Sequence, residues 1–130
     1  MENQKTLVVI KPDAFRSGVW YKVIQILKNQ GLRIVLARFL WSDREMMEDL
    51  YAEHKDKPFF NLLIDHMMSG LNLALCLEGQ SAVSKSRATC LDIREIYASR
   101  TDLSANVVHG SDSFESAQRE IQVIFGDNLN

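Results

Sequence analysis

Short apolar runs and helically spaced apolar residues follow one another along this chain, and they predict strands and helices in turn. The run from Thr6 to Ile10 is β-branched and apolar, which is typical of a buried strand, and Pro12 ends it. Three further stretches predict strands, at residues 32–41, 71–77 and 106–109. We therefore expect four strands in the folded protein.

Helices are predicted in the segments that separate these strands. Apolar residues recur at helical spacing from Gly18 to Gln30, and Gly31 stops the pattern. Ser42 and Glu45 resemble a capping box that opens a helix through Tyr51. The remaining predicted helices cover residues 58–70, 81–89 and 113–125, with Ser113 as the cap of the last one. After the helix at residues 81–89, the stretch to about residue 105 has no assigned element.

The order of these elements favours an α+β fold. Strand, helix, strand, helices, strand, helix, strand and helix suit a ferredoxin-like sandwich, in which helices cover a four-stranded antiparallel sheet. A chain of 130 residues with 46% hydrophobic content can bury one ordinary core. We therefore expect residues 1–130 to form a single domain.

Composition and charge exclude several classes of function. The chain has 15 basic and 17 acidic residues and a formal net charge of −2, so charge gives no argument for a nucleic acid or membrane partner. Cys76 and Cys90 lack the spacing of a metal site, and Cys76 is expected in the core. No secretory signal or membrane-spanning apolar run is visible, which favours a cytoplasmic location.

The segment from Asn106 to Ser113 carries the most distinctive chemistry. The chain has no P-loop, no protein-kinase signature and no paired metal motif. Instead, His109 ends an apolar strand, and Gly110 after it is expected to admit a ligand close to the ring. A neutral imidazole is a good nucleophile toward phosphorus, and Glu120 is the nearby acid that can hold its other nitrogen. The alternative is a partly buried histidine with only a structural role.

Several separated motifs together resemble one enzyme family. The segment Asn106–Asp112 is similar to the active-site signature of the nucleoside diphosphate kinases, and residues 6–14 resemble that family's first strand and lysine. Residues 51–60 are similar to its nucleotide-site helices. The resemblance covers residues 5–125 in order. It implies an enzyme that transfers the γ-phosphate of a nucleoside triphosphate to a nucleoside diphosphate.

The resemblance also implies how the transfer works. His109 is the nucleophile of a ping-pong cycle, and it becomes a phosphohistidine between the two half-reactions. Glu120 and Ser111 hold the imidazole and its partner groups. Lys11 binds the ribose hydroxyls and the transferring phosphate, and Tyr51 lies beside the phosphoryl group. The implied cofactor is Mg²⁺, held mainly by the phosphates and not by a carboxylate cage.

Further residues are implied to bind the nucleotide. Asn106 contacts the ribose, and Arg87 contacts the phosphates, where several negative oxygens converge. Phe59 stacks on the base, and Leu103 closes the other side. Because apolar faces read no base edges, tolerance of different bases is expected. Phe59 and Phe60 both begin a helix, however, and either could be an ordinary core residue.

The chain departs from the family between Arg87 and His109. This stretch is shorter than the family's and contains neither proline nor glycine. The family's second phosphate-binding arginine best matches Arg94, with Arg100 as an alternative, and its threonine has only Thr89 as a candidate. The same stretch contributes to trimer contacts in hexameric members. The sequence therefore favours a dimer-based homo-oligomer over a hexamer.

Two other functions compete with the enzyme. A non-catalytic nucleotide-binding or scaffolding member of the same fold would not need the nucleophile, so the retained residues argue against it. A ferredoxin-like nucleic-acid-binding domain would need a basic surplus or aromatic residues on the sheet face, and this sequence has neither. His54 and His66 have no supporting neighbours in the sequence, and we expect solvent-facing or packing roles for both.

Overall fold

The computed structural model of this protein describes residues 3–41, 43–102 and 104–126. Its strands are β1 (Asn3–Ile10), β2 (Arg33–Trp41), β3 (Leu71–Gln80) and β4 (Val108–Gly110). Its helices are α1 (Pro12–Arg16), α2 (Trp20–Lys28), α3 (Arg44–Leu50), the 3-10 helix η1 (Ala52–His54), α4 (Phe60–Met67), α5 (Ala82–Tyr97) and α6 (Phe114–Phe125).

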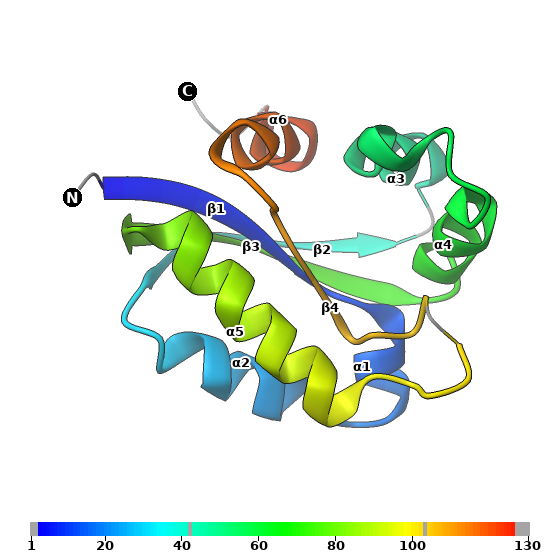
Figure 1. Cartoon of the computed structure of the whole chain (residues 1–130), viewed down its shortest axis with the longest axis horizontal. Helices are drawn as coiled ribbons and strands as arrows, with labels where there is room; N and C mark the ends of the chain where they lie inside the picture. Colours follow the sequence, from blue (N-terminus) through cyan, green and yellow to red (C-terminus); the bar gives the residue numbers. More distant parts are fainter. Residues whose placement is uncertain (1–2, 42, 103, 127–130) are drawn as a thin grey trace.

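The strands form one antiparallel sheet in the order β2-β3-β1-β4. Helices α2 and α5 lie on one face of the sheet, and α3 and α6 lie on the other (Figure 1). This arrangement is the ferredoxin-like α+β sandwich, so the predicted fold is confirmed. The short strand β4 pairs with β1 at one edge, and β2 forms the opposite edge.

The central strand β1 explains why the sheet needs helices on both faces. Leu7 and Val9 point into the cluster under α3, α4 and α6, whereas Val8 and Ile10 point into the cluster under α2 and α5. All four side chains are fully buried. Because alternate residues of a strand face opposite sides, a strand that is buried on both must be apolar throughout. Burial on both faces of the sheet therefore explains the apolar run in the sequence of β1.

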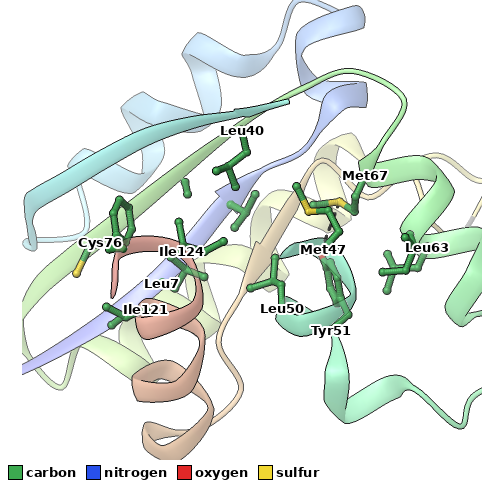
Figure 2. Packing of buried hydrophobic residues seen from close by; sticks show 14 of the residues in the cluster. Leu7, Leu40, Met47, Leu50, Tyr51, Leu63, Met67, Cys76, Ile121 and Ile124 are labelled. Atoms are coloured by element: carbon green, nitrogen blue, oxygen red, sulfur yellow. Dashed lines mark hydrogen bonds between the residues drawn. The ribbon is translucent and has the colours of Figure 1, made fainter. Parts of the chain in front are cut away.

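Figure 2 shows the cluster on the α6 side of the sheet. Ile121 and Ile124 of α6 lie over Leu7, and Met47, Leu50 and the side chains of α4 continue the cluster toward Tyr51. Cys76 is buried among them, as predicted for a small core residue. This cluster fixes α6 and the end of α3 on the sheet.

Helix α5 is longer than the sequence indicated. We expected it over residues 81–89, but it continues to Tyr97. Cys90 and Ile93 are fully buried and Tyr97 packs against the same cluster, so the sheet-facing side of the helix continues. Leu91 and Ile96 are exposed on the other side, and their apolar character hid the helical period in the sequence.

The predicted cap of α6 is present, whereas α3 is capped by the residue after the predicted one. Ser113 caps α6, because its hydroxyl oxygen accepts a hydrogen bond from Ser116 N, as predicted. Asp43 caps α3 through its carboxylate, which accepts from Met46 N. The predicted cap, Ser42, lies outside the described residues.

Within residues 3–41, 43–102 and 104–126, no helix combines the length and apolar character of a membrane span. The cytoplasmic location stays a prediction.

Candidate active site

A cavity of about 700 Å³ opens beside β4, between the segment that joins α3 to α4 and the loop that follows α5. It brings together residues that are far apart in the sequence. Those among its lining residues that the sequence singled out for the site are Lys11, Tyr51, Phe59, Arg87, Arg94, Asn106 and His109. Thr101, Asp102, Ser104 and Asp112 add polar groups to the wall.

His109 is held by a buried carboxylate. Its Nε2 atom lies 2.8 Å from Glu120 Oε1, and Ser111 Oγ donates to the same oxygen at 2.7 Å. The carboxylate of Glu120 is almost fully buried. Because an ionised carboxylate only accepts hydrogen bonds, this contact places the proton on Nε2 and the lone pair on Nδ1. No described residue forms a hydrogen bond with Nδ1, and His109 lines the cavity.

The direction of the His109 side chain follows from strand alternation. Val108 points into the cluster beneath α5, so His109 points to the other face, where α6 carries Glu120. Pairing of β4 with β1 places His109 opposite Val9. Ser111 continues this connection, because its backbone N–H donates to Leu7 O at 3.1 Å. The buried central strand thus fixes the position of the imidazole.

The turn before β4 is strained. Val107 has a positive φ of 62°, and Val108 N donates to Asn106 O at 2.8 Å, which closes a three-residue turn around it. A β-branched residue rarely adopts this left-handed conformation, which costs about 1–3 kcal/mol. Strain of this size persists only where neighbouring groups hold the backbone in place.

Gly110 serves helix packing and not ligand access. A Cβ atom at this position would lie 2.9 Å from Cys90 Sγ on α5. The glycine therefore lets α5 approach β4 closely, which corrects the expectation that it admits a ligand to the ring. Burial raises the pKa of the Cys90 thiol to about 12, with smaller opposing effects from Arg94 and Arg87. Cys90 is a packing residue here.

Tyr51 packs directly against the imidazole. Its ring meets the His109 ring edge-on, with the ring centroids 5.1 Å apart. The hydroxyl is buried, 3.6 Å from Met67 Sδ (Figure 2), and burial raises its pKa well above the usual range. The tyrosine therefore stays neutral, and its ring packs against the imidazole.

Lys11 is a buried cation at the end of β1. Its Nζ atom donates to Ser104 O at 2.5 Å and to Asn106 Oδ1 at 2.7 Å. Burial lowers the pKa of this ammonium group to about 8, an effect that the charge of Asp13 opposes and the charge of Arg94 reinforces. The contact to Asn106 joins two predicted site residues, so the lysine and the amide face the cavity as a pair.

Two arginines of α5 also line the cavity. Arg87 forms an ion pair with Asp112, with Nη1 2.7 Å from Oδ1, and both groups remain partly exposed. Arg94 Nε donates to Val108 O at 3.0 Å, which orients its guanidinium next to β4. The structure places Arg94 in the cavity wall, whereas Arg100 and Thr89 are not among the described residues that line it.

The aromatic pair at the start of α4 divides between two roles. Phe60 is buried in the core, whereas Phe59 is 47% exposed and lines the cavity. Leu103, the predicted partner of Phe59 around a base, lies outside the described residues. His54 also lines the cavity, close to the rings of Tyr51 and Phe59, and its buried Nδ1 has no partner among the described residues. From the sequence we had expected only a solvent-facing or packing role for this histidine.

Arg119 was missed as well. Its guanidinium donates to Asp49 O and Leu50 O at the end of α3 and lies 3.6 Å from the second oxygen of Glu120. The guanidinium also donates to Glu53 Oε1 at 3.2 Å. Arg119 therefore ties the Tyr51 end of α3 to the helix that carries Glu120. Only its position next to Glu120 in the sequence of α6 could have suggested this.

His66, by contrast, is a buried residue outside the cavity. Its Nε2 atom lies 3.0 Å from Asp13 Oδ1, which agrees with the predicted packing role. In the part of the chain that the structure describes, no group of three or more histidine, cysteine or acidic residues is placed to hold a metal ion.

This geometry defines a class of protein: a ferredoxin-like sandwich with three cations and a carboxylate-bound imidazole in one cavity suits the binding of phosphate groups next to a nucleophile. Comparison with known sequences makes the class specific. A sequence model of the nucleoside diphosphate kinase family matches residues 4–129. The nucleoside diphosphate kinase of Archaeoglobus fulgidus is 39% identical over 133 residues, which cover 96% of this chain and 88% of that protein.

Solved structures agree with the sequence comparison. The nucleoside diphosphate kinase of Encephalitozoon cuniculi matches with a TM-score of 0.85 and 32% identity over 98% of this chain and 92% of that one. The enzyme of Halobacterium salinarum, solved in complex with CDP, matches with a TM-score of 0.84 and 31% identity over 98% of this chain and 90% of that one. The chain belongs to the nucleoside diphosphate kinase family. Its activity is the transfer of phosphate between nucleotides.

Proposed function

We propose that His109 carries the phosphate between the two nucleotides. In the first half-reaction, Nδ1 forms a bond to the γ-phosphorus of a nucleoside triphosphate, the bond from that phosphorus to the bridging oxygen breaks, and the diphosphate leaves. In the second, an oxygen of another diphosphate attacks the phosphohistidine and Nδ1 is released. The observation that carries this proposal is the 2.8 Å contact of Nε2 with Glu120, which leaves the lone pair on Nδ1.

Charged and aromatic groups around the imidazole have distinct proposed roles. Lys11, Arg87 and Arg94 neutralise the phosphate oxygens, and an arriving phosphate replaces Asp112 as the partner of Arg87. Glu120 and Ser111 keep the imidazole in one tautomer, and Tyr51 keeps its ring in place. Phosphate transfer needs chiefly positioning and charge neutralisation, which this set supplies.

The nucleoside end of the substrate is proposed to bind at the rim of the cavity. Phe59 offers an exposed ring on which a base stacks, and Asn106 with Lys11 contacts the ribose. Stacking does not read base edges, so we expect broad base tolerance. The CDP complex of the Halobacterium salinarum relative supports a nucleotide in this fold.

We infer that the nucleotide enters as its Mg²⁺ complex. Asp112 and Asp102 are the carboxylates in the cavity wall, and two carboxylates on separate loops do not make a resident cage for a metal. A magnesium ion held mainly by the phosphates fits this donor set. Bound in this way, the ion would add its positive charge to that of Lys11, Arg87 and Arg94 during transfer.

Labelling with γ-³²P-ATP and Mg²⁺ tests the proposal. The protein is expected to become labelled, the label should be stable in alkali and labile in acid, and GDP should discharge it as labelled GTP. The variant His109→Ala should take no label while keeping its thermal unfolding transition. The matched control is His54→Ala, which removes another histidine of the cavity wall and should still become labelled.

Two results would contradict the nucleophile assignment. Label on the His109→Ala variant would place the phosphate on another residue. A wild-type protein that binds nucleotide but takes no label would favour the alternative of a non-catalytic nucleotide-binding member. The alternative of a nucleic-acid-binding domain has lost its support, because the chain belongs to a family of nucleotide kinases.

We also propose that copies of this chain associate through the edge strand β2. Phe39 and Trp41 are 63% and 66% exposed on this strand, and Ile34 is exposed further along it. A free strand edge that carries large apolar side chains is suited to pairing with a second copy, which gives the dimer favoured by the sequence. Sedimentation of the double variant Phe39→Lys/Trp41→Lys should give a monomer; an unchanged mass would exclude β2 as the interface.

A further inference from the structure

Asp13 connects three elements around the nucleophile, although it is not among the residues that line the cavity. It lies on α1, directly after Lys11 and Pro12, and its carboxylate is largely buried. Oδ2 accepts a hydrogen bond from Val107 N at 3.0 Å, and Oδ1 lies 3.0 Å from Nε2 of His66 on α4. Both oxygens are therefore held, one by the turn before β4 and one by a helix of the cavity wall.

The partner of Oδ2 is the strained residue. Val107 has the left-handed φ of 62° that a β-branched side chain disfavours. Its carbonyl oxygen accepts from Lys11 N at 2.8 Å, and its N–H donates to Asp13. Lys11 and Asp13, two residues apart in the sequence, thus bind the carbonyl oxygen and the N–H of Val107. Contacts of this kind can keep a strained conformation populated, because relaxation would break both hydrogen bonds.

The turn at Val107 sets the direction of two site residues. Asn106 precedes it and faces Lys11 Nζ, and His109 follows it in β4. If Val107 relaxed to an ordinary extended conformation, the peptide groups on either side would rotate, and the amide and the imidazole would change their relative placement. We propose that Asp13 is a positioning residue for phosphate transfer, in which its carboxylate holds the turn at Val107 and His66 holds the carboxylate.

Charge gives Asp13 a second connection to the same site. Its carboxylate is the strongest influence that favours the charged form of the buried Lys11 ammonium. The charge and the hydrogen bond can be separated by substitution. Asp13→Asn keeps an oxygen that accepts from Val107 N but removes the charge, whereas Asp13→Ala removes both.

The test rests on the proposed phosphorylation of His109 and measures its rate after rapid mixing with γ-³²P-ATP and Mg²⁺. Asp13→Ala should slow labelling about 10- to 100-fold, because a displacement of about 1 Å at a reacting group has effects of that size. At pH 7, Asp13→Asn should retain most of the rate. The matched control is Asp65→Ala, which removes an exposed carboxylate from α4 that pairs with Arg44, and its rate should equal that of the wild type.

Rescue distinguishes positioning from general stability. Glycine adopts a positive φ without steric cost, so Val107→Gly removes the strain that Asp13 is proposed to hold. The double variant Asp13→Ala/Val107→Gly should recover most of the rate lost in Asp13→Ala. A merely structural role for Asp13 predicts no such recovery, because the hydrogen bond to His66 stays broken. A double variant as slow as Asp13→Ala, or an Asp13→Ala protein that labels at the wild-type rate, overturns the proposal.

Amide hydrogen exchange separates this proposal from the proposed function. The Val107 amide should exchange faster in Asp13→Ala than in the wild type and in Asp13→Asn, under conditions where all three are folded. This measurement does not depend on whether His109 reacts. A wild-type protein that takes no label would refute the phosphohistidine, and unchanged exchange of the Val107 amide in Asp13→Ala would refute the positioning role.

Discussion

The buried side of the cavity, which carries His109, and the rim, which carries Phe59 and the loop after α5, are built in different ways. His109 and Glu120 are 8% and 4% exposed, and short hydrogen bonds connect them to the central strand. Phe59 is 47% exposed, and Asp102 and Thr101 lie on a loop. The proposed reacting group thus sits on a buried short strand that pairs with the central strand, and the proposed nucleoside contacts sit on segments with few buried anchors.

This contrast indicates how one site combines fixed chemistry with tolerant recognition. Phosphate transfer requires the nucleophile within a fraction of an ångström of one geometry, so burial and hydrogen bonds around it are useful. Binding of different bases requires only a flat apolar surface, so an exposed ring is sufficient. Substitutions on the buried side should therefore change the rate of transfer, and substitutions at the rim should change nucleotide affinity.

The largest effect is expected from Glu120→Gln. The amide keeps the size of the side chain but loses the charge that stabilises one tautomer of His109, so kcat should fall about 100-fold. The KM for the nucleotide should change little, because Glu120 does not line the cavity. Steady-state kinetics and the rate of His109 labelling measure both quantities. A variant with normal kcat and raised KM would contradict the expectation that the buried side controls the rate of transfer and not nucleotide affinity.

The next effect concerns pH and the buried cation. Burial lowers the pKa of Lys11 to about 8, an effect that Asp13 and Asp102 oppose and Arg94 reinforces. The protonated form binds phosphate, so kcat/KM should fall as the pH rises through about 8. Lys11→Arg should lower kcat/KM about tenfold at pH 7, because arginine differs in shape, but should abolish this decline. An identical decline in the variant would assign it to another group.

The contribution of Lys11 to the free energy of unfolding should become more favourable as the pH rises, whereas kcat/KM falls. The folded protein lowers the pKa of Lys11 below its unfolded value of 10.5, so the unfolded chain binds more protons between about pH 8 and 10.5. Lys11 therefore destabilises the fold below pH 8, and this penalty decreases as the pH rises through that window. Comparing the thermal unfolding of the wild type with that of Lys11→Met over this range isolates the contribution.

The sequence was sufficient for the buried side of the site. The apolar run of β1 and the cap at Ser113 reflect burial or local hydrogen bonds, which residue types reveal directly, whereas the strand predicted over residues 106–109 is the shorter β4, Val108–Gly110, with His109 in its middle. Glu120 could be paired with His109 because a turn and the start of a helix separate them. The fold followed from the same patterns, since the apolar runs of β1 and β3 correspond to buried strands.

Features that depend on distant contacts could not be predicted. Nothing in the type of Val107 signals a positive φ, because valine disfavours it, and the carboxylate that accepts its N–H belongs to Asp13 on another element. The second half of α5 was hidden because Leu91 and Ile96 are apolar but exposed. At the start of α3, Ser42 and Asp43 are both good caps, and only tertiary structure decides between adjacent candidates.

A smaller effect, on affinity alone, is expected at the rim. Phe59→Ala removes the exposed ring proposed to stack on the base and should raise the KM for nucleotides about tenfold, since stacking contributes about 1–3 kcal/mol per base. The value of kcat should stay within about twofold, because uniform binding does not affect the chemical step. Phe114→Ala is the matched control, because Phe114 has nearly the same exposure, 46%, but does not line this cavity. Equal effects of the two variants would remove the proposed stacking role.

The smallest effect is expected from His54, which lies between the two sides. It lines the cavity beside Tyr51 and Phe59, and its buried Nδ1 has no partner among the described residues. A buried polar atom without a partner costs about 1–3 kcal/mol of stability, so His54→Leu should raise the melting temperature. If the free Nδ1 meets a polar group of the bound nucleotide, the same variant should raise KM about threefold. A gain in stability together with weaker binding would show that the rim keeps an unsatisfied group for its ligand; a gain in stability with unchanged KM would make His54 a packing residue, as its sequence context suggested.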